Sequence, residues 1–172
     1  SGDVRAAVTL DSSIPGWHAR GTASVQRLDL AGWLNRPDRP SDISGDVTLD
    51  LDLDLGGHFP RGAYTFAGSH AAYLGYEADD VQARGTITRT DVLIARATAT
   101  AYGANVRLRD STLAIDAPYP FHFTGTADGV DLRLVPRTVP VPHVESTLAF
   151  DYDVTGQFVD PFLTGHATFG DS

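Results

Sequence analysis

One segment of the sequence alternates strictly between apolar and polar residues, and this alternation constrains the fold more than any other feature. In residues 47–55, VTLDLDLDL, every odd position is Val or Leu and every even position is Thr or Asp. Successive side chains of a β-strand point to opposite faces, whereas a helix would spread the leucines around its circumference. We therefore predict a strand about 30 Å long with one apolar and one acidic face.

The same period of two returns along most of the chain. Residues 147–156, TLAFDYDVTG, again place apolar side chains on one face and aspartates on the other. Further strands are predicted over residues 81–88, 92–102, 106–115, 120–127 and 130–135, with turns at 56–57, 90–91, 102–105 and 128–129. At most one short helix or turn is expected, at residues 28–35. This pattern predicts an all-β chain of long, mainly antiparallel strands.

Three sequence blocks recur in the same order. HARGTASVQRLDL (18–30) is similar to HFTGTADGVDL (122–132), TLDLDLDLGG (48–57) to TLAFDYDVTG (147–156), and GAYTFAG (62–68) to GHATFG (165–170). We therefore expect an internal repeat of about 100 residues, with one copy at 18–121 and a partial copy at 122–172. Residues 1–172 are expected to be a single fragment of a longer repeated domain.

Composition excludes several classes of function. The chain has a formal net charge of −9 and no lysine, so a nucleic-acid partner is not expected. It has no cysteine, which excludes a thiol nucleophile, a zinc-thiolate site and a disulfide framework.

No group of residues in the sequence forms a recognisable catalytic, cofactor-binding or metal-binding motif. Asp50, Asp52 and Asp54 are spaced about 7 Å apart along one strand face, too far to share one ion, and we interpret them as a solvated face. The six histidines show no metal-ligand spacing. We expect no enzyme activity, no cofactor and no metal.

An apolar sheet face has to be covered. Two sheets can pack as a sandwich, one sheet can close into a barrel, or a sheet can curl into a trough that holds another molecule. The alternation alone leaves all three open.

Residues 62–115 bear on this choice. After GAYTFAG come the DVQARGTI segment and a strand of small residues that runs into Tyr-Gly, namely Ala95, Ala97, Ala99, Ala101, Tyr102 and Gly103, with Ala104 and Val106 following. This order, with residues 125–132 and 147–156, resembles the AsmA-like superfamily of diderm bacteria, which includes AsmA and TamB. The resemblance implies an open repeating β-groove, or β-taco, that is apolar inside and polar outside.

The resemblance also implies a function, partners and a location. Such proteins are anchored in the inner membrane by a helix that this sequence does not include, extend through the periplasm and carry phospholipid between the two membranes in cell-envelope biogenesis. Expected partners are phospholipid acyl chains, further repeats of the same chain and outer-membrane assembly proteins. The alternative function is a non-catalytic structural module of outer-membrane-protein assembly or adhesion. The candidate groove residues are Val47, Leu49, Leu51, Leu53, Leu55, Leu148, Phe150, Tyr152 and Val154.

Overall fold

Ten β-strands account for most of the part of the chain that the computed structural model describes, which comprises residues 2–12, 16–29, 31, 40–53, 60–73, 75–116, 118–137, 147–157 and 163–169. The strands are β1 (Asp3–Asp11), β2 (Trp17–Leu28), β3 (Ser41–Leu53), β4 (Arg61–Tyr73), β5 (Tyr76–Ile87), β6 (Asp91–Ala101), β7 (Ala104–Ala114), β8 (Pro120–Asp131), β9 (Thr147–Gln157) and β10 (Leu163–Phe169).

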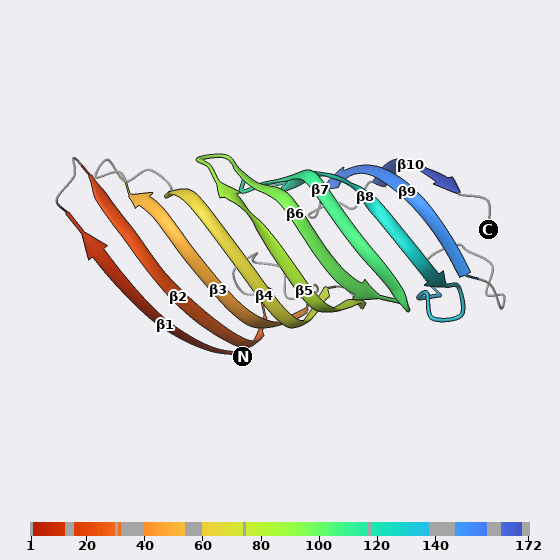
Figure 1. The fold of residues 1–172 in the computed structure, drawn as a ribbon, viewed down its shortest axis with the longest axis horizontal. Coiled ribbons are helices and arrows are strands. Elements are labelled where there is room, and N and C mark those ends of the chain that lie inside the picture. Colours follow the sequence, from red (N-terminus) through yellow and green to blue (C-terminus); the bar gives the residue numbers. More distant parts are fainter. Residues whose placement is uncertain are drawn as a thin grey trace.

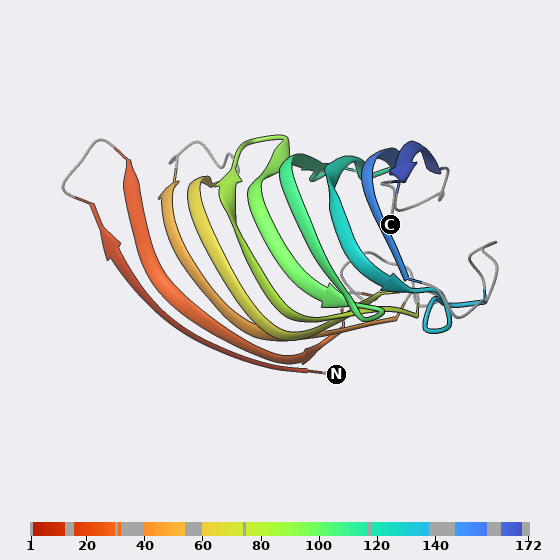
Figure 2. The same ribbon diagram turned by 45° about the vertical axis from the view of Figure 1, so that its right-hand side comes forward.

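All ten strands belong to one antiparallel sheet, in which each strand lies beside its neighbours in sequence. β1 and β10 are the two edges, far apart in both views, so the sheet is open (Figures 1 and 2). Figure 2 shows that the long strands curl, with both ends bent to one side. The described residues include no helix. The prediction of an all-β chain with an open antiparallel sheet is confirmed, and a sandwich or closed barrel is not what forms.

Tight turns explain why consecutive strands pair. Between β6 and β7, Tyr102 and Gly103 have φ values of 51° and 77°. Positive φ at both central residues defines a type I′ hairpin turn, whose twist matches that of the flanking strands. The turn between β5 and β6 is closed by Thr88, whose amide donates to the Asp91 carbonyl at 2.8 Å and whose hydroxyl accepts from the Asp91 amide at 3.0 Å.

Two sequence predictions near residue 130 are wrong. The Asp128–Gly129 pair does not end a strand but forms a bulge inside β8, where the register against β9 shifts and Gly129 has a φ of 85°. Residues 130–135 are not a separate strand. β8 ends at Asp131, whose carboxylate accepts from the Arg133 amide at 3.0 Å and whose carbonyl accepts from the Leu134 amide at 3.0 Å, which turns the chain.

The prediction of a short helix or turn at residues 28–35 lies mostly outside the described residues. Leu28 is the last residue of β2, and Ala31 is in a turn. Asp29 accepts hydrogen bonds from the amides of Ala31 and Ser41 at 3.0 and 3.1 Å, so it links the end of β2 to the start of β3. These two bonds lower the pKa of the Asp29 carboxyl.

Candidate ligand-binding face

The strand register aligns the apolar side chains of neighbouring strands on one side of the sheet, which we call the apolar face. On β3, Val47 lies opposite Ala23 of β2 and Phe66 of β4. The pairing continues from strand to strand, and one row across β1 to β9 consists of Ala6, Ala23, Val47, Phe66, Ala83, Ala97, Leu108, Gly125 and Tyr152. Directly opposite residues share a face, so this row is a continuous apolar strip.

Eight of the nine candidate groove residues lie on this face, and the ninth, Leu55, lies outside the described residues. Val47, Leu49, Leu51 and Leu53 come from β3, and the other four come from β9. β3 and β9 are six strands apart, about 29 Å at the usual strand spacing, so the two groups do not meet.

The residues between the two groups were not singled out from the sequence, although they continue the same face. The sequence did contain a signal for these residues, because apolar and polar residues alternate in each of these strands. The alternation is interrupted by bulges, as at Asp80 and Asp110. Beyond a bulge, the odd-numbered and even-numbered residues of the strand exchange faces. The large members are Tyr64, Phe66, Val81, Ile87, Val92, Ile94, Val106, Leu108, Leu113, Phe121 and Phe123.

The apolar face is more covered than the opposite face. Ala19, Ala97 and Ala127, on the apolar face, are 8%, 8% and 4% exposed. Ala63 and Ala67, on the other face, are exposed. Since all five residues are alanines, the difference in exposure reflects the face of the sheet on which each one lies. Side chains converge on the inner side of a curved sheet, so we infer that the apolar face lies inside the curl.

In the described part of the molecule this face is covered by its own side chains and, near the end of β8, by Val135 from the segment that follows the strand. Substantial contacts between strands occur only between sheet neighbours. The buried apolar residues are mostly alanines, and at the β1 edge Val4, Val8 and Leu10 are 55–57% exposed. The chain exposes 11061 Å², whereas a compact protein of 18.4 kDa exposes about 8,200 Å². The described strands therefore form a single layer, without the second layer that normally completes a core.

Aromatic rings lie flat on this face, over glycines of adjacent strands. A Cβ added at Gly125 of β8 would come within 2.7 Å of the Tyr152 hydroxyl, because the ring from β9 crosses the glycine. Beyond it, the Tyr152 hydroxyl donates to the Arg107 carbonyl of β7 at 3.2 Å. Burial raises the pKa of Tyr152 to about 12.

The same arrangement recurs on β4. Tyr64 extends over Gly85 of β5 and donates to the Leu93 carbonyl of β6 at 3.5 Å, and burial raises its pKa. The ring of Phe66 lies against both Gly45 and Gly68. An aromatic ring that lies over a glycine covers the backbone that the missing side chain leaves exposed. Tyr64, Phe66 and Tyr152 thus cover the backbone of the apolar face with ring surface, whereas Phe121 and Phe123 stack against each other at 4.6 Å.

The opposite side, which we call the polar face, carries cross-strand ion pairs. His18 on β2 places Nε2 at 2.9 Å from Asp50 and Nδ1 at 2.8 Å from Asp52 of β3. His70 pairs with Asp79 at 2.8 Å, and His122 with Asp153 at 2.7 Å. The hydrogen bond that His70 donates to the Asp79 carboxylate raises the pKa of His70. Asp50 and Asp52 of the predicted acidic face thus have a cross-strand histidine partner, and Asp54 lies outside the described residues.

Three further observations concern metal binding, membrane-spanning helices and similarity to known proteins. The described residues hold no group of three or more His, Asp or Glu side chains arranged to bind a metal ion. No helix among them is both long and apolar enough to cross a bilayer. Comparison with known proteins finds no match to a family model, to a curated protein or to a solved structure.

Proposed function

We propose that this chain is a segment of an AsmA-like periplasmic protein and that its apolar face binds phospholipid acyl chains on their way between the inner and outer membranes. One observation carries the proposal, namely a continuous apolar face on a sheet that does not close on itself. Apolar surface of this extent is unfavourable in water, and in soluble proteins a large exposed patch marks a binding surface.

The dimensions of the face suit hydrocarbon chains. Nine steps between ten strands span about 43 Å. One acyl chain covers half of a bilayer core that is about 30 Å thick, or about 15 Å. At least two acyl chains laid end to end therefore fit across the strands of the sheet. The polar phosphate groups would remain at the open side, where water is accessible.

The sequence resemblance supports the periplasmic location and the role in cell-envelope biogenesis, and the further repeats of the same chain would extend the face at the β1 and β10 edges. On this account the protein is not an enzyme and needs no cofactor. The chain could also bind outer-membrane assembly partners, or it could be a structural or adhesion module. Neither role requires lipid on the apolar face, so the crosslinking experiment below tests them as well.

Site-specific photo-crosslinking tests the proposal without disturbing the fold. A diazirine amino acid is placed at Leu49 on the apolar face, or at Thr48, its neighbour on the polar face of the same strand. Each chain is incubated with phosphatidylethanolamine and phosphatidylglycerol vesicles, irradiated and analysed by mass spectrometry. We expect phospholipid adducts at position 49 and few or none at position 48. Equal labelling at the two positions would contradict the proposal, as would labelling at neither.

A further inference from the structure

Three arginines stand in one row across the polar face, on adjacent strands. Arg84 of β5 lies directly opposite Arg96 of β6, and Arg96 lies directly opposite Arg109 of β7. All three side chains are exposed. At the usual strand spacing the row is about 10 Å long. Like charges placed directly opposite each other destabilise a sheet. The presence of this row is therefore not explained by a contribution to the stability of the fold.

Among the described residues the three arginines have no carboxylate partner, whereas Arg20, Arg107 and Arg133 do. Arg20 pairs with Asp50 at 3.0 Å, Arg107 with Asp128 at 2.6 Å, and Arg133 with Asp131 at 2.7 Å. Within the part of the chain that the structure describes, neither Arg84, Arg96 nor Arg109 forms an ion pair, even though Asp110 directly follows Arg109.

Most side chains beside the row are neutral or basic. Thr65 precedes Arg84 in the row and Thr124 follows Arg109. The positions next to the row along β5, β6 and β7 on the same face are Gln82, Thr86, Leu93, Thr98, Arg107 and Thr112. None of these positions is acidic, and the carboxylates beside them are Asp110, in the bulge directly after Arg109, and Asp46, which lines the adjoining hollow.

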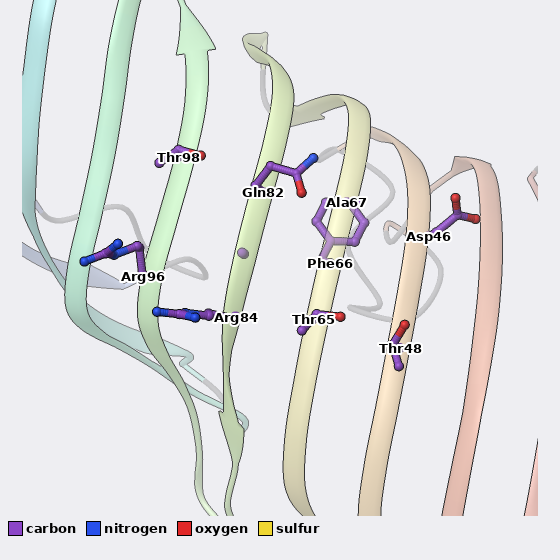
Figure 3. A pocket seen from close by; sticks show the side chains of 10 residues that line it. Asp46, Thr48, Thr65, Phe66, Ala67, Gln82, Arg84, Arg96 and Thr98 are labelled. Atoms are coloured by element: carbon purple, nitrogen blue, oxygen red, sulfur yellow. The ribbon is translucent and has the colours of Figure 1, made fainter.

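Two hollows in the surface meet at the middle arginine. The first, of about 300 Å³, is lined by Arg84, Arg96, Gln82, Thr65 and Asp46 among others (Figure 3). The second, of about 460 Å³, is lined by Arg96, Arg107, Arg109 and Thr126 among others. Figure 3 shows that Arg84 and Arg96 extend in the same direction across the sheet. Arg96 and Thr98 line both hollows, so guanidinium groups, threonine hydroxyls and the Gln82 amide border two adjoining hollows, the first of which also has Asp46 in its lining.

We propose that this row, Arg84–Arg96–Arg109, is a binding site for an anion that carries several phosphate oxygens. The guanidinium group is planar, remains charged and binds phosphate through paired hydrogen bonds. Three such groups in a row match a ligand with more than one negative charge, and the adjacent threonines add neutral donors. The site is on the face opposite the proposed lipid-binding face, so it does not depend on that function.

The phosphate groups can belong to a soluble polyphosphate or to an anionic lipid surface, and two probes distinguish these sources. One is inorganic tripolyphosphate, measured by titration calorimetry at low ionic strength. The other is co-sedimentation with phosphatidylcholine vesicles that contain or lack phosphatidylglycerol. We expect the wild-type chain to bind tripolyphosphate, and binding should weaken as salt is added because the site is exposed. Binding to the anionic vesicles in addition would identify a lipid surface as a ligand.

The triple variant Arg84→Gln, Arg96→Gln, Arg109→Gln should bind the probe at least about tenfold more weakly, since a hydrogen bond to a charged group accounts for about one order of magnitude in affinity. The control variant Arg5→Gln, Arg20→Gln, Arg61→Gln removes the same charge from other strands and should bind like the wild type. Thermal unfolding checks that both variants remain folded, and loss of the like-charged row should not lower the melting temperature. The proposal is overturned if the wild type binds neither probe, or if the two triple variants weaken binding equally.

Discussion

At the scale of single residues, the apolar face depends on glycines paired with aromatic rings. Gly125 and Tyr152 illustrate the requirement. A Cβ at Gly125 would lie 1.9 Å from the Arg107 carbonyl oxygen, which is backbone of the neighbouring strand and cannot yield without moving that strand. The same glycine gives the ring of Tyr152 room to cross β8 and reach that carbonyl. One position therefore serves both the sheet spacing and the flat orientation of the ring.

We predict that Gly125→Ala destabilises the protein by about 3 kcal/mol, the upper part of the range for overpacking, which lowers the melting temperature by roughly 6–12 °C at this chain length. Gly75→Ala is the matched control, since Gly75 has a φ of 81° and open space around its Cβ position, so the cost there is conformational only. That cost is about 1–2 kcal/mol. Differential scanning calorimetry compares the two, and a smaller effect at Gly125 than at Gly75 would refute the steric explanation.

At the scale of elements, cross-strand pairs on the polar face connect neighbouring strands. The pairs His18–Asp52, His70–Asp79 and His122–Asp153 link β2 to β3, β4 to β5 and β8 to β9. His70 has a raised pKa because it hydrogen bonds to Asp79. The folded state therefore holds the His70 proton more tightly than the unfolded chain does. This contribution is fully present below the unfolded pKa of about 6.5 and is lost as pH rises through the folded pKa.

We predict that His70→Gln destabilises the protein more at pH 5.5 than at about pH 9, as measured by urea unfolding at both values. Asp79→Asn should show the same trend with pH, because it removes the group that raises the His70 pKa. An NMR titration of His70 in the wild type and in Asp79→Asn checks the direction of the shift. If the wild type and His70→Gln differ in stability by the same amount at every pH in this range, the His70–Asp79 pair is not a source of pH-dependent stability.

The elements also show what sequence reasoning reached and what it missed. Residues 47–55 identified β3 because its alternation is unbroken, whereas β8 was cut short at Asp128–Gly129, since a bulge glycine has the same sequence signature as a turn. β1 was not predicted, although Val4, Ala6, Val8 and Leu10 alternate with Arg, Ala and Thr. The flat rings and the arginine row could not be foreseen, because both depend on registers between strands.

At the scale of the whole molecule, the matched sequence blocks fall on β2 and β8, β3 and β9, and β4 and β10, each six strands apart. A repeat of this kind would add strands to the same sheet without changing its two faces. The apolar strip would then lengthen with each copy, and the exposed β1 edge, all of whose residues are exposed, is where such an extension would pair. The repeat remains a prediction. If it holds, each repeat is one structural unit that carries both the acidic outer surface and the apolar inner surface.

Native mass spectrometry of the gently purified chain tests the central claim most directly, namely that the apolar face of this open sheet holds acyl chains. The account predicts peaks shifted by the mass of one or more phospholipids, which dissociate on activation and are identified in a second stage of fragmentation. The Leu49→Arg variant, which places a charge on the apolar face, should lose these peaks, whereas Thr48→Arg on the polar face should retain them. A folded wild-type chain that carries no lipid, even after incubation with phospholipid vesicles, would contradict the account.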